Sequence, residues 1–167
     1  SLCVGRGRCV SETGRIGCPG VGDGPTHCDV QGFWDPALTP SCFHGVTTVL
    51  GGNCGFTVHP LNEDAAGYLI RLLAHVEGMS LATLETGVPL NWRTTSEYFE
   101  RLDGTLALNA GFMVGHSAVR RVVMGADAVK REATDEELAA MQRLVRESLE
   151  AGAIGFSSSW SVTHNDK

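Results

Sequence analysis

The apolar positions of the chain fall into two alternating patterns: short runs rich in β-branched residues and longer stretches with helical spacing. Residues 46–50 (VTTVL), followed by two glycines, predict a buried strand. Residues 112–114 and 153–156 predict two more strands. Apolar residues three and four positions apart predict a helix over 64–76 and another that begins near residue 135. Strands that alternate with helices are typical of α/β proteins with a parallel sheet.

Polar residues mark the points where the predicted helices begin. Asn62 stands at the expected N-cap of the first helix, because its side chain can accept a hydrogen bond from an amide of the first turn. Residues 94–97 (TTSE) and 134–137 (TDEE) are capping boxes and predict two further helices. Gly152 is expected to end the last helix. The face of that helix that we expect in the core contains Leu138, Met141, Leu144, Val145 and Leu149.

Reactive or polar residues directly follow each predicted strand. Cys54 lies in a Gly-Asn-Cys-Gly sequence after the first strand, His116-Ser117 follows the second, and three serines (157–159) follow the third. The carboxyl ends of parallel strands meet on one side, which is where the active sites of (β/α)8 barrels lie. A complete barrel typically needs about 250 residues. The 167-residue chain therefore predicts the first strands and helices of a partial TIM-type barrel, truncated at the carboxyl end.

The first 24 residues differ from the rest of the chain. They contain seven of the 21 glycines and few large apolar side chains. Such a segment has little apolar surface to offset the entropy lost on ordering. We therefore expect a poorly packed Gly-rich segment over 1–24, with at most a weak strand near 15–21, and the barrel over 25–167.

Composition excludes several classes of function. A formal net charge of −6 without a basic cluster does not suit a nucleic-acid-binding protein. No apolar run approaches the roughly 20 residues that a membrane span needs. All six cysteines lie within the first 54 residues, which allows a disulfide or Cys-rich zinc module there, although no Cys-x2-Cys pair is present. Because the cysteine-free remainder can form a core unaided, we favour reduced thiols in a cytoplasmic protein.

The candidate chemical residues allow two interpretations each. Cys54 between glycines offers an accessible thiolate, and zinc prefers thiolate and imidazole ligands, but a cysteine packed in a tight turn fits equally well. His27 beside Asp29 indicates a ligand only weakly and also fits a surface loop. His116 could lie in a substrate cleft or cap the following segment. His59, before a proline in a loop, needs no special role.

Several ordered motifs together resemble one family. They are residues 29–36 (DVQGFWDP), 44–49 (HGVTTV), 52–55 (GNCG) and 114–120 (VGHSAVR). In this order they closely resemble the amino-terminal part of N-acyl-D-amino-acid deacylases (D-aminoacylases) of the amidohydrolase superfamily. The resemblance implies a (β/α)8 hydrolase with one or two zinc ions. It implies that His27 and Cys54 bind metal, and that two histidines and a catalytic aspartate come from beyond Lys167. His116 and Ser117 are the candidates for contact with the substrate, because they directly follow a predicted strand.

The activity implied by the resemblance is the hydrolysis of a small molecule, an N-acyl-D-amino acid, by a zinc-activated water. One departure is notable. The family's first strand ends in His-x-His, and the first histidine of that pair is Pro25 here. Proline has no ligating side chain, so a truncated or degenerate homologue without activity is the alternative.

Overall fold

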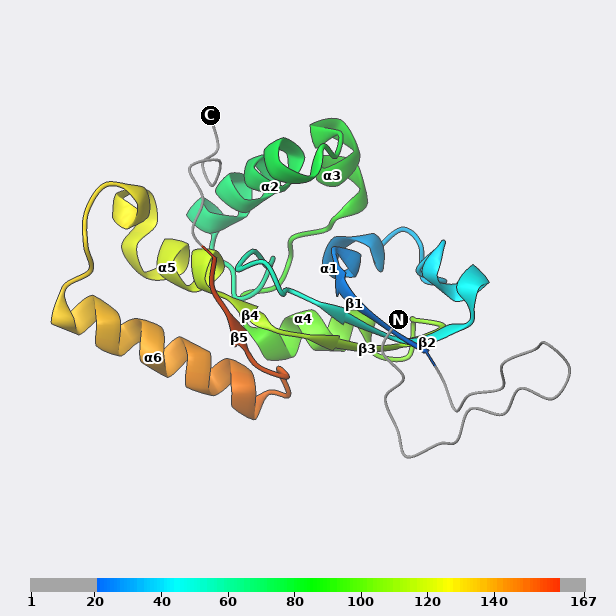
Figure 1. Ribbon diagram of the computed structural model, residues 1–167. Helices are drawn as coiled ribbons and strands as arrows, with labels where there is room; N and C mark the ends of the chain where they lie inside the picture. The colour runs from blue at the N-terminus through cyan, green and yellow to red at the C-terminus, as the bar shows by residue number, and fades with distance from the viewer. Residues whose placement is uncertain (1–20, 160–167) are drawn as a thin grey trace, which may run out of the picture.

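The computed structural model describes residues 21–159. It has the predicted α/β architecture, with parallel strands separated by helices (Figure 1). Strands β1 (Val21–Thr26), β2 (Val46–Gly51) and β3 (Asn109–Phe112) form one parallel sheet in that order. Strands β4 (Val114–Gly115) and β5 (Phe156–Ser157) form a second parallel pair.

Residues 109–115 join the two sheets, because only Met113 separates β3 from β4. The backbone N–H of Met113 donates to the Gly51 carbonyl at 3.0 Å, while the Val114 N–H donates to the Gly155 carbonyl at 2.9 Å. The segment thus has β2 on one side and β5 on the other. The result is a run of neighbouring parallel strands whose carboxyl ends point the same way, as in part of a barrel.

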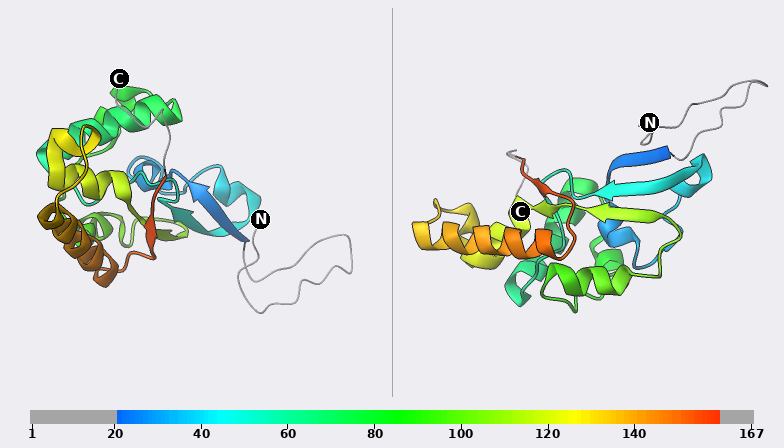
Figure 2. Two further views of the ribbon diagram at one scale, coloured as in Figure 1. Left: turned by 60° about the vertical axis from the view of Figure 1, so that its left-hand side comes forward. Right: turned by 90° about the horizontal axis from the view of Figure 1, so that it is seen from below.

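Helices fill the connections between the strands. Three lie between β2 and β3, namely α2 (Glu63–Glu77), α3 (Leu81–Gly87) and α4 (Thr95–Leu102). Between β4 and β5 lie α5 (His116–Met124), η2 (Gly125–Val129) and α6 (Asp135–Glu150). The short helices α1 (Cys28–Gln31) and η1 (Ser41–His44) connect β1 to β2. Figure 2 shows α2 to α6 grouped at one side of the strands.

The predicted helix starts are confirmed. Asn62 caps α2 by accepting a hydrogen bond from the Ala65 N–H at 2.8 Å. The capping boxes at Thr94 and Thr134 are both formed, so α4 and α6 begin where the sequence indicated. Each such cap stabilises a helix by about 1 kcal/mol, because it satisfies amides that have no partner within the helix.

Two predictions about the last helix and strand need correction. Met141 of α6 is buried, but Leu138 and Leu149 are 49% and 43% exposed, so the expected apolar face packs only in part. The last strand begins at Phe156, not at residue 153. Its pairing nevertheless starts earlier, since the Ile154 N–H donates to the Phe112 carbonyl at 3.0 Å.

The predicted boundary at residue 24 falls inside β1. Within this strand Gly22 pairs with Thr48 and Asp23 pairs with Val49, so these two residues belong to the sheet. The pairing register shifts twice along β1. Residues 1–20, which hold most of the Gly-rich segment and of the weak strand near 15–21, lie outside the described residues.

An aromatic cluster forms the centre of the main core. Trp92 is stacked on Phe33 with ring centroids 5.0 Å apart, and Tyr98 meets both rings edge-on. Trp92 and Tyr98 are almost fully buried, and each polar atom has a partner. The Trp92 indole N–H donates to the Val58 carbonyl at 2.7 Å, and the Tyr98 hydroxyl donates to the Asp29 carbonyl at 2.7 Å. The cluster therefore fixes both segments that follow β1 and β2.

Candidate metal centre

The structure brings together the two residues predicted as metal ligands. His27 directly follows β1, and Cys54 lies in the turn after β2. Because β1 and β2 are adjacent and parallel, with Thr26 opposite Gly51, their carboxyl ends are neighbours. The Sγ of Cys54 lies 3.5 Å from Nε2 of His27.

This separation fits a shared metal ion. Zinc binds imidazole nitrogen at about 2.0–2.1 Å and thiolate sulfur at about 2.3 Å, so tetrahedral geometry puts the two atoms about 3.6 Å apart. The observed 3.5 Å is also compatible with a thiol–imidazole hydrogen bond when no metal is bound. On the other side of the ring, Nδ1 of His27 lies 3.9 Å from the buried carboxylate of Asp29. Carboxylates behind metal-binding imidazoles commonly orient the ring.

The described part of the chain brings together two candidate ligands, fewer than a zinc site needs. Within residues 21–159, no group of three or more His, Cys, Asp and Glu side chains is close enough to hold an ion. Zinc sites use three or four protein ligands. Pro25, in β1, stands two residues before His27 and offers no side-chain donor.

His116 and Ser117 lie at the same end of the strands, as the first residues of α5 after β4. The Nδ1 of His116 is 3.0 Å from the Ser158 hydroxyl, and its ring centroid is 6.1 Å from that of Phe156. Partial burial, together with the charge of Arg120, lowers the pKa of His116. The Ser117 N–H donates to the Gly55 carbonyl at 3.0 Å, next to Cys54. Their contact with substrate stays a prediction.

From the sequence, His59 was expected to be a loop histidine that needs no special role. The structure shows it in the core. Its side chain is completely buried and is stacked on Tyr98 with ring centroids 4.4 Å apart. Nδ1 of His59 lies 3.2 Å from the hydroxyl oxygen of Thr95, which itself donates to Ser148 at 2.8 Å. Because the hydroxyl proton of Thr95 is used in that bond, Nδ1 of His59 must carry the proton. The apolar residues around His59 in the sequence were the available signal of its burial.

The buried His59 makes stability depend on pH. Burial lowers the pKa of His59 to about 3. In the unfolded chain a histidine has a pKa of about 6.5. Between these values the unfolded chain binds a proton that the folded chain does not. Stability is therefore fully present above this window and falls as the pH decreases through it. We expect the free energy of unfolding, from urea titrations, to drop by about 2 kcal/mol from about pH 7 to about pH 5.

Two variants identify the source of this drop. His59→Phe keeps an aromatic ring against Tyr98 but removes the titration, so its stability should change much less over the same pH range. His116→Asn removes the other histidine with a lowered pKa and should keep most of the drop. Equal drops in the His59→Phe variant and the unaltered chain would contradict the assignment.

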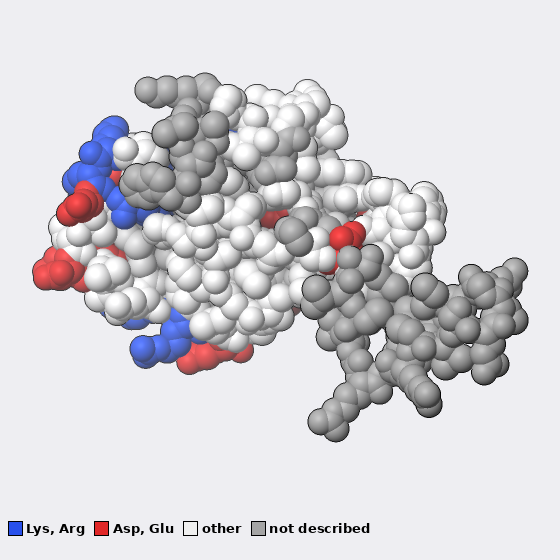
Figure 3. Space-filling model, viewed as in Figure 1, with Lys and Arg blue, Asp and Glu red and all other residues white. Residues whose placement is uncertain are grey.

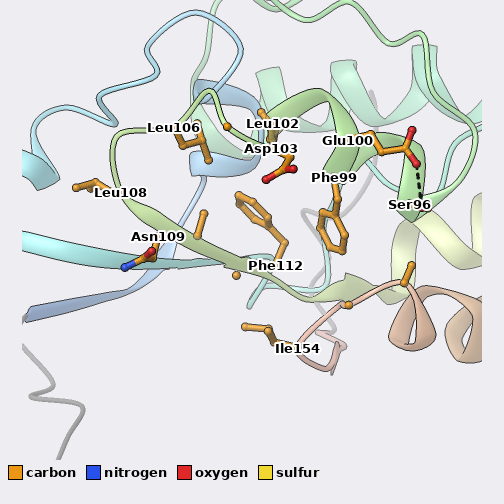
Figure 4. A pocket seen from close by; sticks show the side chains of 15 residues that line it. Ser96, Phe99, Glu100, Leu102, Asp103, Leu106, Leu108, Asn109, Phe112 and Ile154 are labelled. Carbon is orange, nitrogen blue, oxygen red and sulfur yellow. Dashed lines mark hydrogen bonds between the residues drawn. The ribbon is translucent and has the colours of Figure 1, made fainter.

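A cavity of about 580 Å³ lies away from these residues (Figure 4). It is lined by all four residues of β3, by α4 and the loop that follows it, and by the segment that precedes β5. Phe99, Leu102, Leu106 and Phe112 form much of its apolar wall. None of the four predicted site residues lines it, so it is separate from the candidate metal centre.

Charged side chains gather at one edge of the molecule, over α5, η2 and α6 (Figure 3). They are paired there: Arg131 bonds to both carboxylate oxygens of Glu137 at 2.7 and 2.8 Å, which lowers the pKa of Glu137 to about 2. Arg131 also lies 3.4 Å from Asp127.

In residues 21–159 no helix has the length and apolar character required to cross a membrane.

Comparison with known proteins gives consistent matches. The profile of the amidohydrolase family matches residues 13–165. An uncharacterized protein of Mycobacterium tuberculosis is 39% identical over 153 residues, which cover 89% of this chain and 25% of that protein. A D-aminoacylase of Alcaligenes xylosoxydans xylosoxydans is 37% identical over 151 residues, covering 89% of this chain and 28% of the enzyme.

Solved structures agree with the sequence matches. The crystal structure of a D-aminoacylase, whose binuclear metal centre has been described, has a TM-score of 0.65 at 38% identity. The N-acyl-D-glutamate deacylase of Bordetella bronchiseptica, complexed with zinc and a phosphonate that mimics the tetrahedral intermediate, has a TM-score of 0.63 at 32% identity. Each alignment covers 84% of this chain and 27% of the other. The chain thus spans about a quarter of the length of these relatives, and the predicted partial-barrel fold is confirmed.

Proposed function

Because this chain belongs to the amidohydrolase family, we propose that it forms the metal-binding first part of a hydrolase that cleaves the amide bond of N-acyl-D-amino acids. The relatives named D-aminoacylase and N-acyl-D-glutamate deacylase support this substrate class. The observation that carries the metal dependence is the 3.5 Å separation of His27 Nε2 and Cys54 Sγ at the ends of adjacent parallel strands.

In the proposed mechanism, His27 and Cys54 would hold zinc, either as a single ion or as one of two. When bound, the ion would supply a water with a pKa of about 7 and a Lewis acid for the amide carbonyl. Cys54 binds as the thiolate, so metal affinity should fall in acid as the sulfur is protonated. Thiolate ligation also requires reduced cysteines, which supports a cytoplasmic location.

The remaining roles follow from position. His116 and Ser117 lie beside the Cys54 turn and are proposed to contact the small-molecule substrate. A carboxylate that takes the proton of the attacking water is proposed to come from beyond Lys167, as the resemblance implies. The Asp29 carboxylate is fully buried behind His27 and is better placed to orient that ring than to reach the substrate.

The test uses a protein that contains this chain and the remaining strands of the barrel. Its metal content is measured, together with its turnover of the two enantiomers of a substrate. We expect bound zinc, and release of the D-amino acid from an N-acetyl-D-amino acid but not from its L-enantiomer. Protein that takes up no zinc and shows no turnover after incubation with zinc would contradict the proposal.

Pro25 favours a second candidate, a homologue without activity. If that is correct, the protein binds zinc weakly or not at all and releases no amino acid. A Pro25→His variant separates the two readings, because it restores the family's His-x-His pair. Turnover that appears only in this variant would identify the natural chain as degenerate, whereas turnover in the unaltered protein would exclude this candidate.

A further inference from the structure

The turn that carries Cys54 (residues 52–55, the Cys54 turn) is tied to a distant strand. The hydroxyl of Ser157, in β5, donates a hydrogen bond to the Gly52 carbonyl and accepts one from the Gly55 N–H at 3.1 Å. A serine hydroxyl has one proton and two lone pairs, so a single side chain makes both contacts. Ser157 thereby bridges the two residues that flank Asn53 and Cys54, across more than 100 positions of sequence.

The Cys54 turn has flexible ends that need such a tie. Gly52 and Gly55 both have φ of 81°, in the left-handed region that glycine enters without strain. Two glycines at the ends of a turn leave its direction poorly fixed by the local chain. Hydrogen bonds from outside the turn can supply the missing constraint.

The turn also rests directly on β4, where Gly115 makes room for it. A Cβ atom at Gly115 would lie 2.6 Å from the Gly55 carbonyl oxygen and 2.9 Å from the Thr57 nitrogen. The Gly115 N–H donates to the Thr57 hydroxyl at 3.0 Å. Two residues after β5, the hydroxyl of Ser159 donates to the Cys54 carbonyl itself.

We propose that Ser157 is a positioning residue for the metal centre: it holds the Cys54 turn so that the thiol faces His27. This rests on the proposed metal-dependent function. Ser157 is itself buried, and its contacts are to the backbone on either side of Cys54, so it acts through the turn and not on the metal. The proposal implies that the Cys54 ligand is in place only when β5 has docked beside β4.

The test compares Ser157→Ala with Ser148→Ala in a chain whose other five cysteines are replaced, Cys28 by alanine and the rest by serine. Ser148 is a matched control, because it is a buried serine whose hydroxyl also makes two hydrogen bonds but lies in α6. Cobalt(II) is the probe, and the readouts are its affinity and its thiolate-to-metal charge-transfer absorption. We expect Ser157→Ala to lower the cobalt(II) affinity by about 10–100-fold and to weaken the absorption, as the loss of other residues that orient metal ligands does. The cobalt(II) affinity of Ser148→Ala should stay within about threefold of that of the parent chain.

A second readout needs no metal and separates failure of this proposal from failure of the proposed function. The alkylation rate of Cys54 in the metal-free chain should change severalfold in Ser157→Ala and stay unchanged in Ser148→Ala. If Ser157→Ala does not fold, the exposed Ser159→Ala decides the question: a changed alkylation rate supports the proposal, and an unchanged rate overturns it. Equal effects of Ser157→Ala and Ser148→Ala, or no effect of either, would also overturn it, whether or not cobalt binds.

Discussion

Replacement of Cys54 by serine is expected to lower the zinc affinity of the chain by at least about 10–100-fold, because loss of a ligand should cost no less than loss of a residue that orients one. Among the described residues, Cys54 and His27 are the two candidate ligands, and the Cys54 Sγ lies 3.5 Å from the His27 Nε2. A serine hydroxyl does not ionise near neutral pH and therefore cannot replace a thiolate. Competition with a chromophoric zinc chelator at neutral pH measures the change.

Cys42→Ser is the matched control for this prediction. Cys42 is a half-buried thiol on η1, before β2, and belongs to no group of three metal-ligating side chains among residues 21–159. Its replacement should leave zinc affinity unchanged. Equal losses in both variants would indicate binding by the scattered cysteines, and no loss in Cys54→Ser would remove Cys54 from the centre.

Replacement of Trp92 by alanine is expected to lower the free energy of unfolding by about 3–5 kcal/mol. The side chain is 1% exposed, is stacked on Phe33 and meets Tyr98 edge-on, so truncation leaves a cavity in the aromatic cluster. It also removes the donor to the Val58 carbonyl, a buried group four residues after Cys54. Urea titration near neutral pH measures the loss, which is a large part of the stability of an ordinary domain.

Trp34→Ala provides the comparison for Trp92. Trp34 is 41% exposed and lies outside the aromatic cluster. Its removal should cost about 1 kcal/mol or less, because much of its surface already faces solvent. Similar losses in the two variants would contradict the central role of Trp92 in the core.

Local signals in the sequence determined much of the fold. The β-branched run that became β2 and the three helix starts depend on residues close in sequence, so their patterns were sufficient. The apolar face of α6 was less informative, because periodicity shows which side of a helix is apolar and not what packs against it. Leu138 and Leu149 therefore stayed half-exposed where burial was expected.

The sequence named candidate site residues but not the residues that support them. The pairing of His27 with Cys54 was implied by the resemblance, because the sequence pattern predicted no strand directly before His27. The structure has β1 there, adjacent and parallel to β2. The contact of Ser157 with the Cys54 turn depends on tertiary packing across about 100 residues, which no local pattern encodes. The burial of His59 likewise depends on Tyr98 and Thr95, which lie more than 30 positions away.

The central claim is that one metal ion contacts both His27 and Cys54, and X-ray absorption at the zinc edge tests it most directly. For the chain loaded with one zinc, we expect a single sulfur neighbour at about 2.3 Å and imidazole nitrogen at about 2.0–2.1 Å. The sulfur signal should disappear in Cys54→Ser, and the imidazole signal should weaken in His27→Ala. Zinc surrounded by two or more sulfurs, or by none, in the unaltered chain would contradict the claim.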